Sequence, residues 1–144
     1  MKAIVSRYLL LAFLSMAPLN VSQVGYSHLT NEEITMIAQI TFGEAGNQSE
    51  LGKRLVIDSL LNRRDDKHFP NTISGVIFAE GQFNTAKCIE SYPVKEDILR
   101  LIKEECINRT NRNVVYFNRG GYNSWGKPLF QEGEHYFAAC HYGD

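Results

Sequence analysis

The chain has 144 residues, enough for one domain with a single hydrophobic core. Apolar residues make up 44% of it and charged residues 22%, which is ordinary for a globular protein. The formal net charge is −1 and no basic patch or arginine-rich helix stands out, so nucleic acid is not an expected partner.

The first 27 residues differ in character from the rest of the chain. Lys2 and Arg7 precede an apolar run at residues 8–17, which has the length of a signal-peptide core and is too short to span a membrane. A retained signal-anchor or a buried first helix would also fit this pattern. We expect a leader at 1–27, a single domain at 28–144, and export to the periplasm, the cell wall or the extracellular space. Any membrane contact would be made through an uncleaved leader.

A first helix is expected after the leader, because Thr30 and Glu33 have the spacing of a capping box. The residues that then recur at helical spacing are Ile34, Ile37, Ala38 and Thr41. Glu44 continues this face, so its carboxylate is expected on the core side in the last turn. Residues 45–47 include Gly and Asn, which favour a left-handed helix ending.

The next segment, residues 51–64, is apolar on almost every side in its middle and predicts a central helix surrounded by protein. Further helices are expected at 72–79 and from Pro93 to Cys106, and strands at 114–117 and 135–139, with a turn at Gly120-Gly121. The expected fold class is therefore α+β, mostly helical, with a small β element near the C-terminus.

Three cysteines could form one disulfide with one free thiol, or could be small buried side chains: Cys88, Cys106 and Cys140. The sequence leaves the choice open. No CxxC motif exists and the four histidines show no HExxH spacing, so we expect neither a metal site nor a cofactor. A cysteine nucleophile with His135 as its base has no local motif in its favour.

Glu44 is the strongest candidate for catalysis. An apolar surround and the negative end of a helix dipole both disfavour the charged form of a carboxyl group, which suits a general acid. The alternative is a frayed surface glutamate at a helix end, and the local pattern alone does not decide between the two.

Four short motifs follow one another along the chain: Phe42-Gly43-Glu44-Ala45, Leu60-Leu61-Asn62-Arg63, Phe69-Pro70-Asn71-Thr72 and Gly81-Gln82-Phe83. Their order and spacing resemble the catalytic domain of the SleB/CwlJ-type cell-wall hydrolases, the spore-cortex-lytic family and its phage and bacterial relatives. The likeness runs from about residue 33 to 83 and returns more weakly at 116–137. It implies a fold like that of lysozyme and the lytic transglycosylases, with residues 28–144 as one catalytic domain.

The resemblance also implies an activity. It matches Glu44 to the family's catalytic glutamate and implies cleavage of the β-1,4 bond after N-acetylmuramic acid in peptidoglycan, by lytic transglycosylation. Glycan strands would be the partner of a monomeric protein. Two alternatives stay open: a plain hydrolytic muramidase or glucosaminidase, and a non-catalytic peptidoglycan-binding module.

Amide and aromatic side chains along these motifs suit sugar binding, through paired hydrogen bonds and stacking. The residues expected to bind substrate are Gln82, Phe83, Asn84, Tyr116, Asn118, Trp125 and His135. Each has a structural alternative: loop packing for Gln82 and Phe83, the core for the single tryptophan, and a structural role for His135. Asn62 and Arg63 are expected to hydrogen-bond the loop that follows them.

Family members commonly carry a second acid a few residues after the catalytic glutamate, and that position is Gln48 here. A glutamine cannot titrate, so a single-acid mechanism is expected, with the substrate's 6-hydroxyl or N-acetyl group doing the second task. The remaining candidates for a second carboxylate are Asp58, Asp65, Asp66 and Glu80. If Asp58 is buried, it is expected to pair with Arg54 or a backbone donor.

Overall fold

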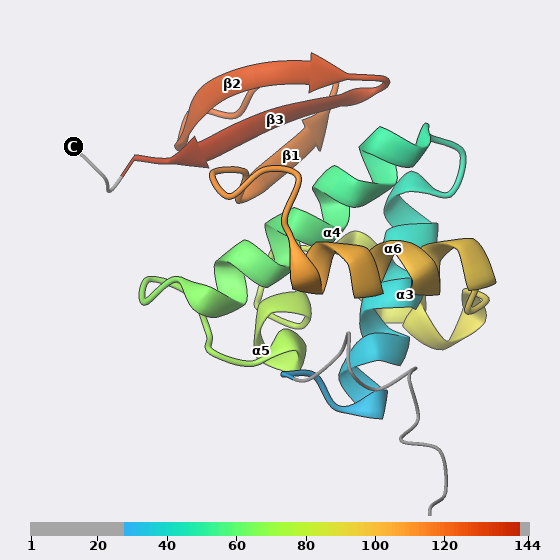
Figure 1. The fold of residues 1–144 in the computed structure, drawn as a ribbon. Helices are drawn as coiled ribbons and strands as arrows, with labels where there is room; N and C mark the ends of the chain where they lie inside the picture. The colour runs from blue at the N-terminus through green and yellow to red at the C-terminus, as the bar shows by residue number, and fades with distance from the viewer. Residues whose placement is uncertain (1–27, 142–144) are drawn as a thin grey trace, which may run out of the picture.

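The computed structural model describes residues 28–141 and contains a helical part followed by a small sheet (Figure 1). The helices are α3 (Asn31–Ala45), α4 (Glu50–Asp65), α5 (Ile73–Ile77) and α6 (Glu96–Ile107), with a 3₁₀ helix η1 (Asn84–Ser91) before α6. The strands are β1 (Tyr116–Arg119), β2 (Gly126–Glu132) and β3 (His135–Cys140). The expected mostly helical α+β fold is confirmed, and the expected leader lies outside the described residues.

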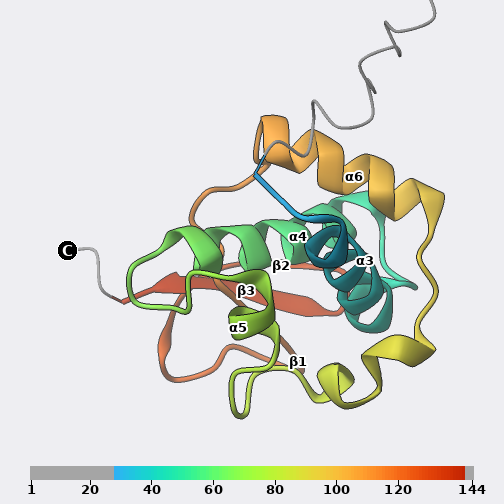
Figure 2. The same cartoon turned by 90° about the horizontal axis from the view of Figure 1, so that it is seen from below.

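Helix α4 is the centre of the molecule, as its sequence predicts. In Figures 1 and 2 the sheet lies along one side of α4, and α3 and α6 lie on the other side. Every residue from Leu55 to Arg63 is buried. One apolar cluster joins α4 to the other helices, and a second, around Val56 and Phe137, joins it to the sheet. Within residues 28–141, no helix is long and apolar enough to cross a membrane.

Helix α3 begins with the expected capping box on Thr30. It ends at Ala45, but the expected left-handed ending is wrong, because Gly46 has φ −57°. The N–H of Gly46 donates to the carbonyl of Phe42 and the N–H of Gln48 to that of Ala45, at 2.8 and 2.9 Å. These bonds satisfy the last carbonyls without a left-handed residue. The short link to α4 thus follows directly from the last turn that carries Glu44.

The sheet has the strand order β1-β3-β2, and both pairings are antiparallel. Strands β1 and β3 are the two that the sequence predicts, with Arg119 opposite His135. Strand β2 was not predicted, since it contains Pro128, which cannot donate to a ladder. An edge strand tolerates such a residue, and the register shifts between Pro128 and Phe130. Pro93, expected inside the last helix, instead precedes α6.

Candidate active site

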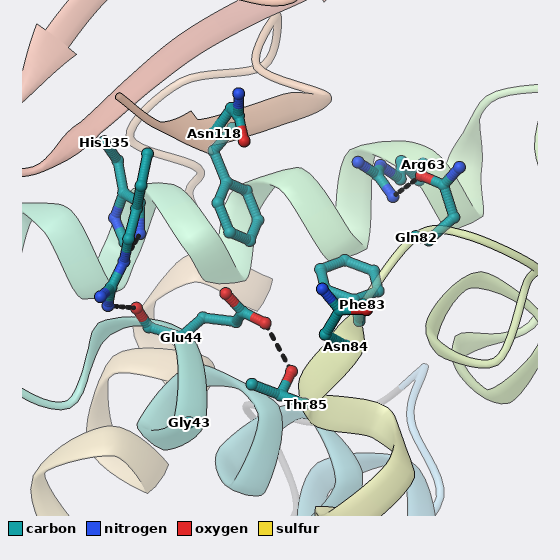
Figure 3. Close-up of a pocket in the computed structure, with 11 residues that line it drawn as sticks. Gly43, Glu44, Arg63, Gln82, Phe83, Asn84, Thr85, Asn118 and His135 are labelled. Carbon is teal, nitrogen blue, oxygen red and sulfur yellow. Dashed lines mark hydrogen bonds between the residues drawn. The ribbon is translucent and has the colours of Figure 1, made fainter. Parts of the chain in front are cut away.

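A cavity of about 360 Å³ lies between the end of α3, the start of η1 and the sheet (Figure 3). We call it the Glu44 pocket. Its lining residues are Gly43, Glu44, Arg63, Gln82, Phe83, Asn84, Thr85, Phe117, Asn118, Arg119 and His135. The fold therefore brings together most of the site residues expected from the sequence, and it leaves Tyr116 and Trp125 outside.

Glu44 lies in the last turn of α3 and is partly buried. The hydroxyl of Thr85 donates a hydrogen bond to its Oε1, and Figure 3 shows the other carboxylate oxygen pointing away from Thr85 into the pocket. Glu44 is the only carboxylate among the lining residues. Its side chain is thus held at one oxygen and presented to the cavity at the other, as a proton donor requires.

Arg119 joins the sheet to the end of α3. Its Nη2 donates to the backbone carbonyl of Glu44 at 2.9 Å, and its Nε donates to Nε2 of His135 at 3.4 Å. The ring of His135 is fully buried, with edge contacts to Phe117 and Phe137 at centroid distances of 5.2 and 6.0 Å. Burial and the charge of Arg119 lower the pKa of His135, so the imidazole is neutral and can accept this bond.

Arg63 holds the side chains of the opposite pocket wall in place, as Arg119 does on the side of the sheet. Its Nη1 donates to Oε1 of Gln82 at 2.9 Å, and its guanidinium lies 5.6, 5.1 and 5.3 Å from the ring centroids of Phe69, Phe83 and Tyr116. Burial lowers the pKa of Arg63 to about 10, which leaves it charged at neutral pH. Since arginine can only donate, this bond fixes the orientation of the Gln82 amide, with its oxygen toward Arg63.

The three aromatic residues expected to bind sugar differ in exposure and in their distance from the pocket. Phe83 is buried and packs against Phe117 at a centroid distance of 5.8 Å, so it forms part of the pocket wall. Tyr116 packs against Phe69, behind that wall. Trp125 is 65% exposed outside the pocket, so the core interpretation of the single tryptophan is wrong.

Asn62 and Arg63 have the structural role expected of them, but with another segment of the chain. The amide of Asn62 donates to the carbonyls of Asn111 and Val114 at 2.9 and 2.8 Å, and Arg63 donates to the carbonyl of Val115. These bonds fix the segment that leads into β1. They thereby set the position of the strand that carries Asn118 and Arg119.

The other acids considered for catalysis lie away from the Glu44 pocket. Asp58 is fully buried and accepts the backbone N–H of Asn111 at 2.7 Å, so the expected backbone donor is confirmed and Arg54 instead pairs with Glu105. Three further acids lie elsewhere: Asp65 beside Arg64 and Arg109, Asp66 beside His68, and Glu80 in a neighbouring cavity.

Gln48 connects two turns rather than lining the pocket. Its Oε1 accepts the backbone N–H of Glu134 at 3.0 Å, and its Nε2 donates to the Glu134 carboxylate at 3.1 Å. A glutamate at this position could not donate, and it would place a second negative charge beside Glu134. The glutamine therefore ties the α3–α4 link to the β2–β3 turn.

The cysteines and the titratable side chains show no further site. All three cysteines are free thiols, and Cys88 is exposed, so the structure fits neither a disulfide nor three buried side chains. In the part of the chain that the structure describes, no three side chains of His, Cys, Asp or Glu form a group that could hold a metal ion.

Two pocket residues carry no signal that sequence reasoning could have used. Thr85 follows the Gly-Gln-Phe motif and Arg119 ends β1, and each reaches Glu44 only through the fold. Gly43 has a close neighbour, because a Cβ there would lie 2.7 Å from the ring of Tyr92, which would have to move. Of the three, only this glycine stands within a motif that the sequence had singled out.

Comparison with known proteins identifies the family to which the chain belongs. Residues 47–138 match the sequence profile described as Cell Wall Hydrolase, so the matched segment begins just after Glu44. The chain is 29% identical over 115 residues to a spore cortex-lytic enzyme of Bacillus subtilis (strain 168), covering 75% of this chain and 38% of that protein. It is 30% identical over 120 residues to a spore cortex-lytic enzyme of Bacillus cereus, covering 78% and 45%. The chain thus spans less than half the length of these relatives.

Two solved structures have a similar fold. The catalytic domain of the Bacillus cereus SleB protein superposes with a TM-score of 0.68 at 24% identity, covering 76% of this chain and 91% of that one. The catalytic domain of a germination-specific lytic transglycosylase, SleB from Bacillus anthracis, gives 0.66 at 25% identity, covering 77% and 97%. The resemblance found in the sequence motifs is confirmed, and the chain belongs to the cell wall hydrolase family.

Proposed function

We propose that this protein cleaves the glycan strands of peptidoglycan at the β-1,4 bond after N-acetylmuramic acid, with Glu44 as its one catalytic carboxyl group. The observation that carries this proposal is the isolation of Glu44 as the only carboxylate among the residues that line the pocket. Membership of the cell wall hydrolase family and similarity to spore cortex-lytic enzymes support the substrate class.

The pocket suits a polar, uncharged ring. The NH₂ group of Gln82 and the amides of Asn84 and Asn118 offer donors and acceptors for hydroxyl and N-acetyl groups. Arg119 is 53% exposed at the rim, where its Nη1 lies 3.6 Å from the carboxylate of Glu134, so its positive charge is paired. Its bond to the Glu44 carbonyl also holds the last turn of α3 against the sheet, so the acid and the binding groups keep one relative position.

The reaction needs one acid that becomes a base. Glu44 donates its proton to the bridging glycosidic oxygen as the bond from that oxygen to C1 of muramic acid breaks. The 6-hydroxyl of the same sugar then bonds to C1, and its proton passes to the Glu44 carboxylate. The acid is regenerated, no water is consumed, and the product ends in 1,6-anhydro-muramic acid.

Two observations support this reaction over hydrolysis. A glycosidase with two carboxyl groups holds them about 5 Å apart when it retains configuration and further apart when it inverts, and no second carboxylate lines this pocket. The Bacillus anthracis protein of similar fold is named a lytic transglycosylase.

Mass spectrometry of purified peptidoglycan after digestion tests the proposal. We expect muropeptides that are lighter by one water than hydrolytic products and that resist borohydride reduction. Reducible muramic acid as the sole product would show that the enzyme hydrolyses the bond. It would also direct the search to another carboxylate. Reducible glucosamine would show that a different bond is cut, and the absence of any cleavage would favour a binding module.

The proposed substrate lies outside the cytoplasmic membrane, so we propose that the protein is exported through its N-terminal leader. The support is the basic and then apolar composition of residues 1–17. N-terminal sequencing of the native protein tests it, with a start near residue 28 expected after cleavage. A cytosolic protein beginning at Met1 would contradict export.

A further inference from the structure

A second cavity of about 360 Å³ lies beside the Glu44 pocket. The two cavities share Gln82, Phe83 and Asn84, so this short segment forms a wall between them. The remaining walls of the second cavity come from the end of α5, the loop after it, and the first turns of η1. The two cavities are therefore neighbours that share one wall.

The chemistry of the second cavity differs from that of the first. Phe78, an aromatic side chain on its wall, is 54% exposed. Glu80 and Lys87 add one negative and one positive charge, and both are exposed. Within residues 28–141, no ion pair joins either of them to another side chain. Both charges are available to a ligand.

We propose that this second cavity binds the peptide stem of peptidoglycan, an inference that rests on the proposed glycan cleavage at Glu44. The sugars of the strand apart from the muramic substituent are uncharged and offer no partner for a full positive or negative charge. The stem carries free carboxylates and, in its diamino acid, an ammonium group. It leaves the muramic ring through the lactyl ether on C3, so it begins within one sugar's width of the cleaved bond.

Each wall residue then has a partner in the stem. The ammonium of Lys87 pairs with a stem carboxylate, and the carboxylate of Glu80 pairs with the amino group of the diamino acid. Phe78 covers the methyl groups of the alanine residues, which would explain an aromatic side chain left exposed at this place. The cavity thus selects strands that keep their peptides over bare glycan.

The experiment compares two substrates: purified glycan strands with peptides, and the same strands after amidase treatment, which removes the stem and leaves a lactyl carboxylate on each muramic acid. The variants are Lys87→Gln, Lys87→Glu and Phe78→Ala, and the control is Lys67→Gln, which removes an exposed lysine that lines neither cavity. We expect Lys87→Gln to lower kcat/KM about threefold to fivefold on stem-bearing strands, as loss of an exposed ion pair does, and Lys87→Glu to lower it about tenfold. On bare strands both should change kcat/KM less than twofold.

Equal losses on both substrates would overturn the stem proposal and indicate that the second cavity holds another sugar. No loss on either substrate would overturn it as well. In both cases wild-type cleavage would still support the proposed function, so the two failures are distinguishable.

A binding measurement covers the case in which the wild type cleaves neither substrate. Calorimetry with Glu44→Gln compares a soluble disaccharide peptide with the same disaccharide lacking the peptide. We expect the peptide to tighten binding and Lys87→Glu to abolish that gain. Equal affinity for the two ligands would contradict the proposal whatever the catalytic result.

Discussion

Two carboxyl sites, one at the end of α3 and one between α4 and α6, differ in almost every physical respect. Glu44 is partly buried, receives one hydroxyl hydrogen bond and faces a cavity. Asp58 and Glu105 are fully or almost fully buried, and Arg54 and Thr110 donate to Glu105. Burial and a hydrogen bond to Glu105 raise the pKa of Asp58 to about 8.

The comparison shows that the most strongly perturbed carboxyl group of the two sites lies outside the Glu44 pocket. The perturbed pair connects α4, α6 and the segment before β1, and it lines no part of the Glu44 pocket. A perturbed pKa marks a functional candidate only when the group also faces a cavity. We therefore expect substitutions at the two sites to have different effects. Those at Glu44 should lower activity, and those at the buried pair should lower stability.

The largest expected effect is at Glu44. Glu44→Gln keeps the size of the side chain and removes the proton donor, so cleavage should fall on the order of 10²-fold or more. The melting temperature should stay close to that of the wild type, because Glu44 is only partly buried. Assays on purified sacculi with Glu90→Gln, an exposed carboxylate on η1, as the control would measure this. Near wild-type digestion by Glu44→Gln would move catalysis elsewhere.

Glu105→Ala should lower the stability of the fold. It removes the partner of Arg54 and Thr110 inside the protein, so the free energy of unfolding should fall by about 3 kcal/mol. Urea unfolding measures this, with Glu104→Ala as the matched control. Glu104 also binds Arg54 but is 42% exposed, so its loss should cost less than about 1 kcal/mol. Equal losses for the two variants would show that burial of the pair does not matter.

The pH dependence of stability gives a third test. Below about pH 4 Asp58 is protonated in both the folded and the unfolded chain, and between about 4 and 8 only the folded chain keeps the proton. Stability should therefore fall as the pH rises through this window and level off above it. In Asp58→Asn, the amide can donate to Glu105 and accept from Asn111 without titrating.

Unfolding curves at pH 6 and pH 9 would make the comparison. Between pH 6 and pH 9 the free energy of unfolding of the wild type should fall by on the order of 2 kcal/mol more than that of Asp58→Asn. The pKa of Arg54 is raised and that of Glu105 is lowered, so both groups stay charged throughout this range. The same loss in both proteins would contradict a proton held by Asp58.

Thr85 should produce the smallest of these effects. Thr85→Val keeps the shape of the side chain and removes the hydroxyl that holds Oε1 of Glu44. We expect kcat to fall about tenfold with little change in KM, because the acid loses its orientation while the binding groups stay. Thr85→Ser should restore most of the rate. A change confined to KM would assign Thr85 to substrate binding instead.

Much of the helical part could be predicted because its signals are local. The capping box at Thr30 acts over three residues, and the face that places Glu44 repeats every three or four. The buried middle of α4 follows from an apolar run that no exposed helix could carry. The β1–β3 pair was also predictable, from two short strand patterns and a glycine turn between them.

The parts that could not be predicted depend on distant residues. The bond from Thr85 to Glu44 spans 41 positions and the bond from Arg119 spans 75, so no local pattern records either one. Strand β2 is a different case, because it pairs with the neighbouring β3 and was missed since Pro128 and the register shift beside it hide the strand pattern. Whether Trp125 is buried or exposed could not be predicted for the same reason as the bonds to Glu44, since exposure depends on what the rest of the chain covers.

The sequence by itself determined the α-helices α3 to α6, the family and the candidate catalytic glutamate, because periodicity, capping and motif spacing are properties of neighbouring residues. Only the tertiary structure decided which groups surround that glutamate. It placed Thr85 and Arg119 beside Glu44, assigned His135 and Arg63 to holding the pocket walls, and left Trp125 outside. The reason is physical: a pocket forms where packed elements from distant parts of the chain meet, and packing is set by the whole core.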